Sequence, residues 1–215
     1  MIGGEFDRIA RYFAPLAGNG ALNLADDAAL WTPPSGKTAV LTVDQMIEGV
    51  HFLPDDPPGC VARKLLRRNL SDLAAMGAEP VAYLLTTALR AETPEAWLAD
   101  FAAGLAQDQK HYGITLFGGD STSTPGPLMT SVTMIGTVTP GGELRRAGAR
   151  AGDAVYVTGT IGDAVLGLMA TRGKLDDPSG YFRERRLLPE PRVGLHLAGP
   201  VHAAIDISDG LVQDL

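Results

Sequence analysis

The sequence predicts an α+β protein with two domains, and three features lead to this expectation. Segments with helical periodicity alternate with β-branched, apolar segments over residues 1–139. The Pro140-Gly141-Gly142 stretch then interrupts the pattern, and strand and helix patterns resume after it. We therefore expect an N-terminal domain over residues 1–139 and the start of a C-terminal α/β domain over residues 140–215.

The N-terminal domain is expected to begin with an amphipathic helix, because apolar residues recur at helical spacing over residues 6–16. The β-branched, apolar segment 38–43 predicts a strand that ends at Asp44. A second helix is expected over residues 61–73, and Gly77 suits the position just after its end.

Four further elements complete the expected N-terminal domain. Residues 80–89 predict a strand, and Thr93–Leu105 a third helix in which Thr93 is the N-cap. A short strand over residues 114–117 is expected to stop at the Gly118-Gly119-Asp120 turn. Residues 128–138 form the last expected strand of this domain.

In the second domain, residues 154–158 predict a strand that turns through Gly159–Asp163 into a helix. A further helix is expected over residues 190–198, and a last strand over residues 203–207. The chain reaches Leu215 as another helix begins, so we expect this domain to be incomplete.

Composition restricts the classes of function. The formal net charge of −7 over 215 residues argues against a nucleic-acid partner, which would require a basic face. Anionic substrates stay open, because bound divalent ions can reverse a local field. A lone cysteine, Cys60, suits a reducing cytoplasm. No secretory signal and no apolar run of the ~20 residues that a membrane span needs is visible, so we expect a cytoplasmic protein without a membrane partner.

Aspartates recur where predicted strands give way to turns, and this pattern carries most information about function. They are Asp26, Asp27, Asp44, Asp120, Asp206 and Asp209, and Asp72 lies within a helical segment. If they converge, like charges about 4 Å apart repel by roughly 4 kcal/mol per pair, so a cluster needs bound cations. We therefore predict a magnesium-loaded phosphate site. The alternative is that each aspartate is a turn or cap residue and that Asp72 faces solvent.

Several other residues have both a functional and a structural interpretation. Gly119 permits close approach to a ligand or forms a tight turn. Arg146 could hold nucleotide phosphate or belong to a solvated charge pair. The Gly159–Gly162 turn lacks the ending of a P-loop, and we interpret it as structural. His51 is structural unless a substrate lies beside it. The basic run from Arg63 to Arg68 is expected to be an exposed helix face.

Taken together, the motifs resemble those of the thiamine-monophosphate kinase family, in the same order and over nearly the whole chain. The matching segments are Gly4-Glu5-Phe6, Asp26-Asp27-Ala28-Ala29, Val43-Asp44, Glu48-Gly49-Val50-His51-Phe52, Asn69-Leu70-Ser71-Asp72-Leu73-Ala74-Ala75-Met76-Gly77, Gly118-Gly119-Asp120 and Ile205-Asp206-Ile207-Ser208-Asp209-Gly210.

The resemblance implies the fold of the superfamily of aminoimidazole-ribonucleotide synthetase and selenophosphate synthetase. Its N-terminal domain, with a mixed sheet, would bind ATP and magnesium and form a homodimer through that sheet. The implied reaction is the phosphorylation of thiamine monophosphate by ATP to thiamine diphosphate, a kinase step of thiamine biosynthesis. The implied Mg²⁺ ligands are Asp27, Thr42, Asp44, Asp72, Asp120, Asp206 and Asp209. Nucleotide contacts would come from Gly119, Asp120, Arg146 and Ser208, and a substrate contact from His51.

The chain departs from the family pattern at three points. Ala25 replaces a glycine before the aspartate pair, Val43 replaces a hydroxyl residue, and the family's chains continue past Leu215. Related synthetases fit less well, because the purine-pathway enzyme has Asp-Gly-Val-Gly-Thr-Lys where Asp44–Gly49 stands here. Selenophosphate synthetase needs a reactive residue near its N-terminus, which Cys60 does not provide.

Phosphoryl transfer to a phosphate monoester needs no general base, since that acceptor is already largely deprotonated near neutral pH. We expect direct in-line transfer in which carboxylate-held Mg²⁺ offsets the repulsion between two polyanions. Three alternatives stay open: another ATP-dependent synthetase of the superfamily, a magnesium-dependent phosphatase, and a non-catalytic, dimerising metal-binding module.

Overall fold

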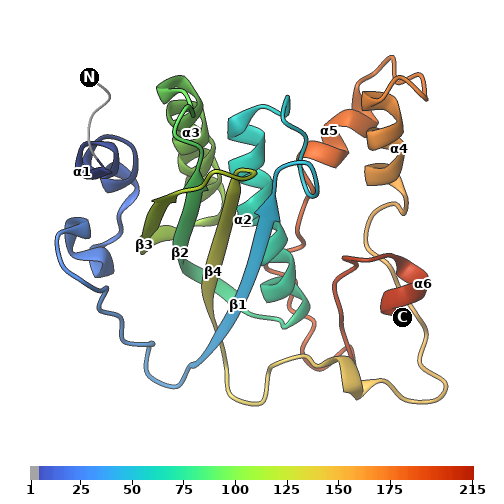
Figure 1. Ribbon diagram of the computed structural model, residues 1–215. Coiled ribbons are helices and arrows are strands. Elements are labelled where there is room, and N and C mark those ends of the chain that lie inside the picture. Colours follow the sequence, from blue (N-terminus) through green and yellow to red (C-terminus); the bar gives the residue numbers. More distant parts are fainter. Residues whose placement is uncertain (1–4) are drawn as a thin grey trace.

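The computed structural model describes residues 5–215, so Gly4 of the Gly4-Glu5-Phe6 motif lies outside the described residues. A four-stranded sheet and two long helices dominate the first 138 residues, and shorter helices follow (Figure 1). The helices and strands are α1 (Glu5–Arg8), β1 (Thr38–Ile47), α2 (Pro58–Ala75), β2 (Glu79–Leu89), α3 (Glu95–Tyr112), β3 (Thr115–Ser123), β4 (Met129–Val138), α4 (Asp163–Thr171), α5 (Tyr181–Leu187) and α6 (Leu211–Asp214).

The sheet is mixed, as predicted for an α+β fold, and its strand order is β1-β4-β2-β3. β4 pairs antiparallel with β1 and with β2, whereas β2 and β3 are parallel. The parallel pair requires a crossover, and α3 provides it. β1 and β3 are therefore the two edge strands (Figure 1).

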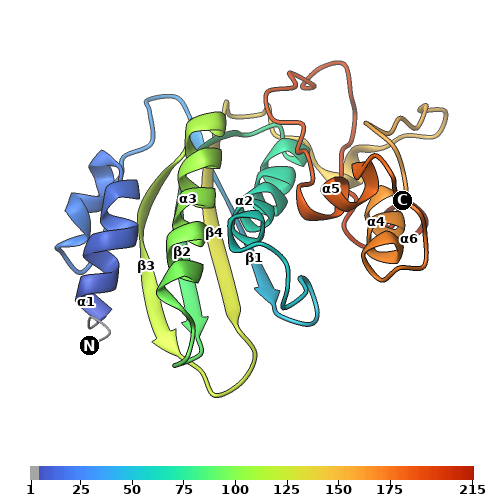
Figure 2. The same cartoon turned by 90° about the horizontal axis from the view of Figure 1, so that it is seen from above.

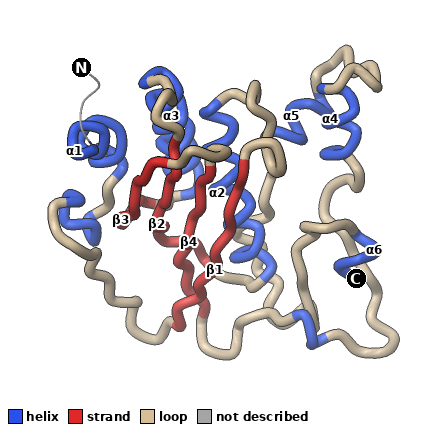
Figure 3. Tube along the Cα trace, viewed as in Figure 1, coloured by secondary structure: helices blue, strands red, loops and turns tan. Residues whose placement is uncertain are grey.

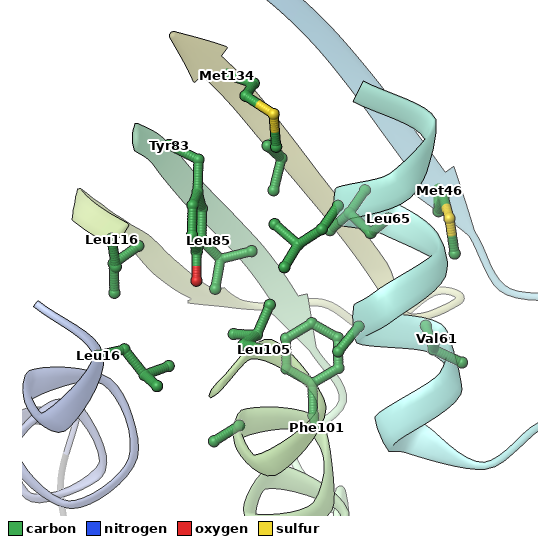
Figure 4. Close-up of a cluster of buried hydrophobic side chains, with 14 of the residues drawn as sticks. Leu16, Met46, Val61, Leu65, Tyr83, Leu85, Phe101, Leu105, Leu116 and Met134 are labelled. Atoms are coloured by element: carbon green, nitrogen blue, oxygen red, sulfur yellow. The ribbon is translucent and has the colours of Figure 1, made fainter. Parts of the chain in front are cut away.

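α2 and α3 cover one face of the sheet, and the main core lies between them and the strands (Figure 2). Tyr83 and Met134 point from the sheet toward Leu65 of α2 and Phe101 of α3, all with no exposed surface (Figure 4). The apolar periodicity that predicted both helices reflects this buried face. On the other face, Ala29 and Trp31 pack against Phe117 near β3, while Leu41 and Val43 of β1 stay about two-thirds exposed, at 66% and 64%.

α2 and α3 approach each other closely at two glycines. A Cβ atom on Gly104 of α3 would lie 2.3 Å from the backbone oxygen of Gly59 in α2. Backbone cannot move aside as a flexible side chain can. We therefore expect Gly104→Ala to lower the free energy of unfolding by about 2 kcal/mol, as overpacked cores do. Urea denaturation measures this effect, and Gly126→Ala is the control, because the added atom there meets only an ordinary contact at 3.4 Å and the φ of Gly126 is not positive.

Several boundaries in the N-terminal domain differ from the sequence prediction. β1 continues to Ile47, so Asp44 lies within the strand, and β3 runs through Gly118-Gly119-Asp120 to Ser123. Both strands stay paired with a neighbouring strand beyond the aspartate. This pairing outweighs the weak strand propensity of Asp. The opening helix divides into α1, a π-helical turn and a 3₁₀ turn ending at Leu16. The Thr93 cap is wrong: Pro94 is the N-cap, and Thr93 Oγ1 has no partner among residues 5–215.

The segment after β4 contains α4, α5 and α6 joined by long loops (Figure 3). The helix predicted from residue 159 onward is present as α4, but the strands predicted over 154–158 and 203–207 are not formed. In the described chain these segments have no neighbouring strand, and a strand needs one to satisfy its backbone groups. The helix predicted over 190–198 is also wrong; α5 lies earlier, at 181–187.

None of the helices found within residues 5–215 is long and apolar enough to cross a membrane.

Candidate functional site

The candidate site forms where β1 passes α2. Because β1 side chains alternate between the two faces of the sheet, Thr42 and Asp44 both point toward the helix-covered face. The Thr42 hydroxyl donates a hydrogen bond of 2.6 Å to Asp72 Oδ2 on α2. Asp72, which sequence reasoning left between a solvent-facing and a functional role, is thus held against the strand.

Asp206 is distant in the sequence, but its charge interacts with those of Asp44 and Asp72. Burial raises the pKa of Asp206, and the charge of Asp72 raises it further, while a hydrogen bond from Ser71 opposes the change. Burial and the charge of Asp44 raise the pKa of Asp72 in the same way. Burial also raises the pKa of Asp44, with Arg68 opposing and Asp206 adding to the increase. The three carboxylates therefore destabilise one another's ionised forms.

Two arginines lie near the three aspartates, and sequence reasoning missed the closer one. Arg68 Nε lies 3.1 Å from Asp44 Oδ2. Arg146, predicted to contact nucleotide, is exposed, and its charge partly offsets the burial that raises the pKa of both Asp72 and Asp206. Arg68 stands four residues before Asp72 on a helix, so both share one face. That four-residue spacing could have predicted Arg68 as a neighbour of the acidic site.

The expectation that the basic run of α2 is an exposed face is wrong. Arg67 is 8% exposed, and both it and Arg63 donate to the fully buried Asp108 of α3, at 2.6 and 2.9 Å. Lys64 Nζ donates to the backbone oxygen of His51 at 2.9 Å, and burial lowers its pKa to about 8. Each cation is turned toward a partner that is distant in the sequence.

His51 lies in the turn that follows β1. The Ile47 N–H donates to His51 Nδ1 at 3.1 Å, so the neutral ring carries its proton on Nε2. Burial lowers the pKa of His51, and the charge of Arg68 lowers it further. The ring is therefore neutral at pH 7 and presents an N–H donor.

The remaining predicted residues lie elsewhere in the chain. Asp120 and Gly119 are on β3, at the opposite edge of the sheet from Asp44, three strand spacings or roughly 14 Å away. Asp27 is exposed and precedes Ala29, which packs near β3. Ser208 and Asp209 are exposed, and their N–H groups donate to Asp214 Oδ2 at 2.9 and 3.1 Å. The structure thus brings together Thr42, Asp44, Asp72 and Asp206, but not the other three predicted Mg²⁺ ligands, Asp27, Asp120 and Asp209.

The chemistry of this donor set fits magnesium, which prefers carboxylate and other oxygen ligands. Mutual repulsion between Asp44, Asp72 and Asp206 also favours a bound cation. Within residues 5–215, however, no group of three or more His, Cys, Asp or Glu side chains is close enough to hold a metal ion.

Comparison with known proteins agrees with the fold. Residues 25–138 match the family model of the N-terminal domain of AIR synthase related proteins. The thiamine-monophosphate kinase of Caulobacter vibrioides is 47% identical over 98% of this chain, and that of Escherichia coli K12 is 41% identical over all of it. A solved structure described as AaThiL complexed with AMPPCP and TMP has a TM-score of 0.78 and 31% identity, covering 88% of this chain and 62% of that one.

The match of residues 25–138, which include the mixed sheet and its two long helices, identifies an AIR synthase related protein. More narrowly, the chain belongs to the thiamine-monophosphate kinase family. It spans 61% of the length of the Caulobacter protein and 68% of the Escherichia coli protein.

Proposed function

We propose that this chain catalyses the ATP-dependent phosphorylation of thiamine monophosphate to thiamine diphosphate, in the cytoplasm. The observation that carries the proposal is the convergence of Asp44, Asp72 and Asp206 on one side of the sheet. The names of the relatives and the ligands AMPPCP and TMP of a related structure support the same reaction. The lone Cys60 fits a reducing compartment.

In this proposal Thr42, Asp44, Asp72 and Asp206 hold Mg²⁺, together with Asp27, Asp120 and Asp209. When bound, Mg²⁺ would neutralise charge on the transferring phosphoryl group. Arg146, Gly119, Asp120 and Ser208 contact the nucleotide, and the His51 Nε2–H donates to the substrate. We assign residues 1–139 to a nucleotide- and metal-binding domain and residues 140–215 to part of a second domain.

The reaction needs charge neutralisation and positioning more than proton transfer, because the acceptor phosphate is already deprotonated. We therefore propose direct in-line transfer without a phosphoenzyme. A chiral-phosphate assay should show inversion at phosphorus, and net retention would contradict a single in-line step.

The test of the function is ADP formation from purified protein with Mg²⁺, ATP and thiamine monophosphate. We expect ADP and thiamine diphosphate in equal amounts. Phosphate release without ATP would favour a magnesium-dependent phosphatase. ADP formation that depends on a different acceptor would favour another synthetase of the superfamily. Metal binding without any turnover would favour a non-catalytic module.

We further propose that the chain forms a homodimer through the open face of its sheet. Leu41 and Val43 are exposed there beside Thr133 and Ile135 of β4, an apolar surface that a monomer would leave in water.

Val43→Arg is expected to convert the dimer to a monomer, because it places a charge in the centre of the apolar surface. Multi-angle light scattering should show the mass fall by half at micromolar concentration. Ile161→Arg is the matched control, since Ile161 is also exposed but lies just before α4 and outside the sheet. A Val43→Arg variant that keeps the wild-type mass would place the interface elsewhere.

A further inference from the structure

A second site lies outside the acidic one. A cavity of about 510 Å³ opens between α2, α3 and the segment around α5, which lies beside α2 (Figure 2). Its basic lining consists of Arg63, Arg67, His111, Arg185 and Arg192. None of the residues assigned above to metal, nucleotide or thiamine monophosphate lines this cavity.

Most donors of three of these arginines are unused within residues 5–215. Arg63 donates only through Nε, to Asp108 at 2.9 Å. Arg185 donates to Glu190 at 3.5 Å, the limit for a hydrogen bond, and its buried Nε lies 3.6 Å from Asp163 Oδ2, an ion-pair distance that is too long for a hydrogen bond. Arg192 only reaches Glu190, at 3.9 Å. Since each guanidinium carries five N–H donors, the cavity offers many unpaired donors to an anion.

Arg67 has a different role in this cavity. It donates twice to Asp108 and once to the backbone oxygen of Pro189, and it stacks on the ring of Tyr112 at 5.6 Å. It therefore holds the segment after α5 against α2 and α3. Tyr112, Tyr181 and Leu188 add apolar surface to the lining.

Glu190 marks where an anion would sit. Its Oε2 lies between Arg185 and Arg192, at 3.5 and 3.9 Å, and its side chain is 59% exposed. These contacts are too long for a tight ion pair. A phosphate monoester carries nearly twice the charge and three acceptor oxygens, and it would satisfy both guanidinium groups better.

We propose that this cavity binds a phosphorylated small molecule, with the phosphate between Arg63, Arg185 and Arg192 in place of the Glu190 carboxylate. The organic part lies against Tyr112 and Tyr181. The volume suits a small phosphate ester, within the usual range of ligand pockets. This site is independent of the proposed kinase reaction, because it uses no metal and none of the residues assigned to Mg²⁺, nucleotide or thiamine monophosphate.

Isothermal titration calorimetry on the purified chain at pH 7.5 with EDTA tests the site, because EDTA keeps Mg²⁺ from holding phosphate at the acidic residues. The probes are inorganic phosphate and phenyl phosphate. Arg192→Gln should weaken binding of both about tenfold, the loss expected for one charge-assisted contact. Glu190→Gln should strengthen it several-fold, because it removes the competing carboxylate. Arg150→Gln, an exposed arginine outside the cavity, should change nothing.

The two substitutions should change the affinity for the probes in opposite directions, so the proposal can be tested clearly. Wild-type affinity in both Arg192→Gln and Glu190→Gln, or no measurable binding of either probe to the wild type, would show that the cavity is not a phosphate site. Equal affinity for the two probes would remove the role of Tyr112 and Tyr181 but keep the arginines. Circular dichroism melts confirm that each variant is folded. A failed kinase assay would not contradict phosphate binding in this cavity, and a lack of phosphate binding would not contradict the proposed kinase reaction.

Discussion

Replacing Asp72 by asparagine is expected to lower the turnover of the proposed thiamine-monophosphate kinase reaction about a thousandfold, as loss of one group that stabilises transition-state charge does. Asparagine keeps the size of the side chain and can still accept the hydrogen bond from Thr42. The change therefore removes charge from the acidic site without removing its packing. The measurement is ADP formation at saturating ATP and Mg²⁺.

Asp176→Asn is the matched control, because Asp176 is exposed in the loop between α4 and α5. It should keep wild-type turnover. In EDTA, Asp72→Asn should also raise the free energy of unfolding by about 0.5 kcal/mol, since it relieves repulsion from Asp44 and Asp206. Wild-type turnover in Asp72→Asn would remove Asp72 from the proposed Mg²⁺ ligands.

Arg186→Met is expected to lower the free energy of unfolding by about 3 kcal/mol, because it leaves a buried carboxylate without its cation. Arg186 of α5 donates to both oxygens of Asp56, at 2.8 and 2.5 Å, and both residues are 7% exposed. This pair joins two segments 130 residues apart. Urea denaturation at pH 7 measures the loss.

The double variant Asp56→Asn/Arg186→Met should recover most of that loss, since no unpaired charge is then buried. Arg172→Met, at an exposed arginine after α4, is the control. Burial alone would raise the pKa of Asp56, but hydrogen bonds from Arg186 and the Leu53 N–H lower it overall. The stability from this pair is thus present above the unfolded pKa of about 3.9 and is lost as pH falls through the lower folded value. An unchanged urea midpoint in Arg186→Met would contradict this role.

Much of the N-terminal fold could be predicted from local pattern. The apolar stripes of α2 and α3 and the β-branched runs of β2 and β4 are visible in the sequence. Burial of one face of an element requires apolar residues at a regular spacing along the chain. The convergence of Asp44, Asp72 and Asp206 was also anticipated, through their positions in the motifs. Their roles as Mg²⁺ ligands stay predictions.

What could not be predicted depends on partners far away in the sequence. Nothing near Arg67 in the sequence indicates that Asp108 will neutralise it, so the basic run was interpreted as an exposed face. The strand pattern of 154–158 failed for a related reason: a β-branched segment becomes a strand only beside another strand. Tyr156 instead has 88% of its surface exposed.

One helix sets the geometry of several sites at once. α2 directs Arg63 and Arg67 to Asp108, Lys64 to the His51 turn, and Arg68 and Asp72 to β1. Each residue in a helix advances by about 1.5 Å and 100°. An insertion or deletion of one residue inside α2 would rotate every later side chain away from its target. Residues along α2 can therefore be exchanged one at a time, whereas a change in their number would disturb several distant contacts together.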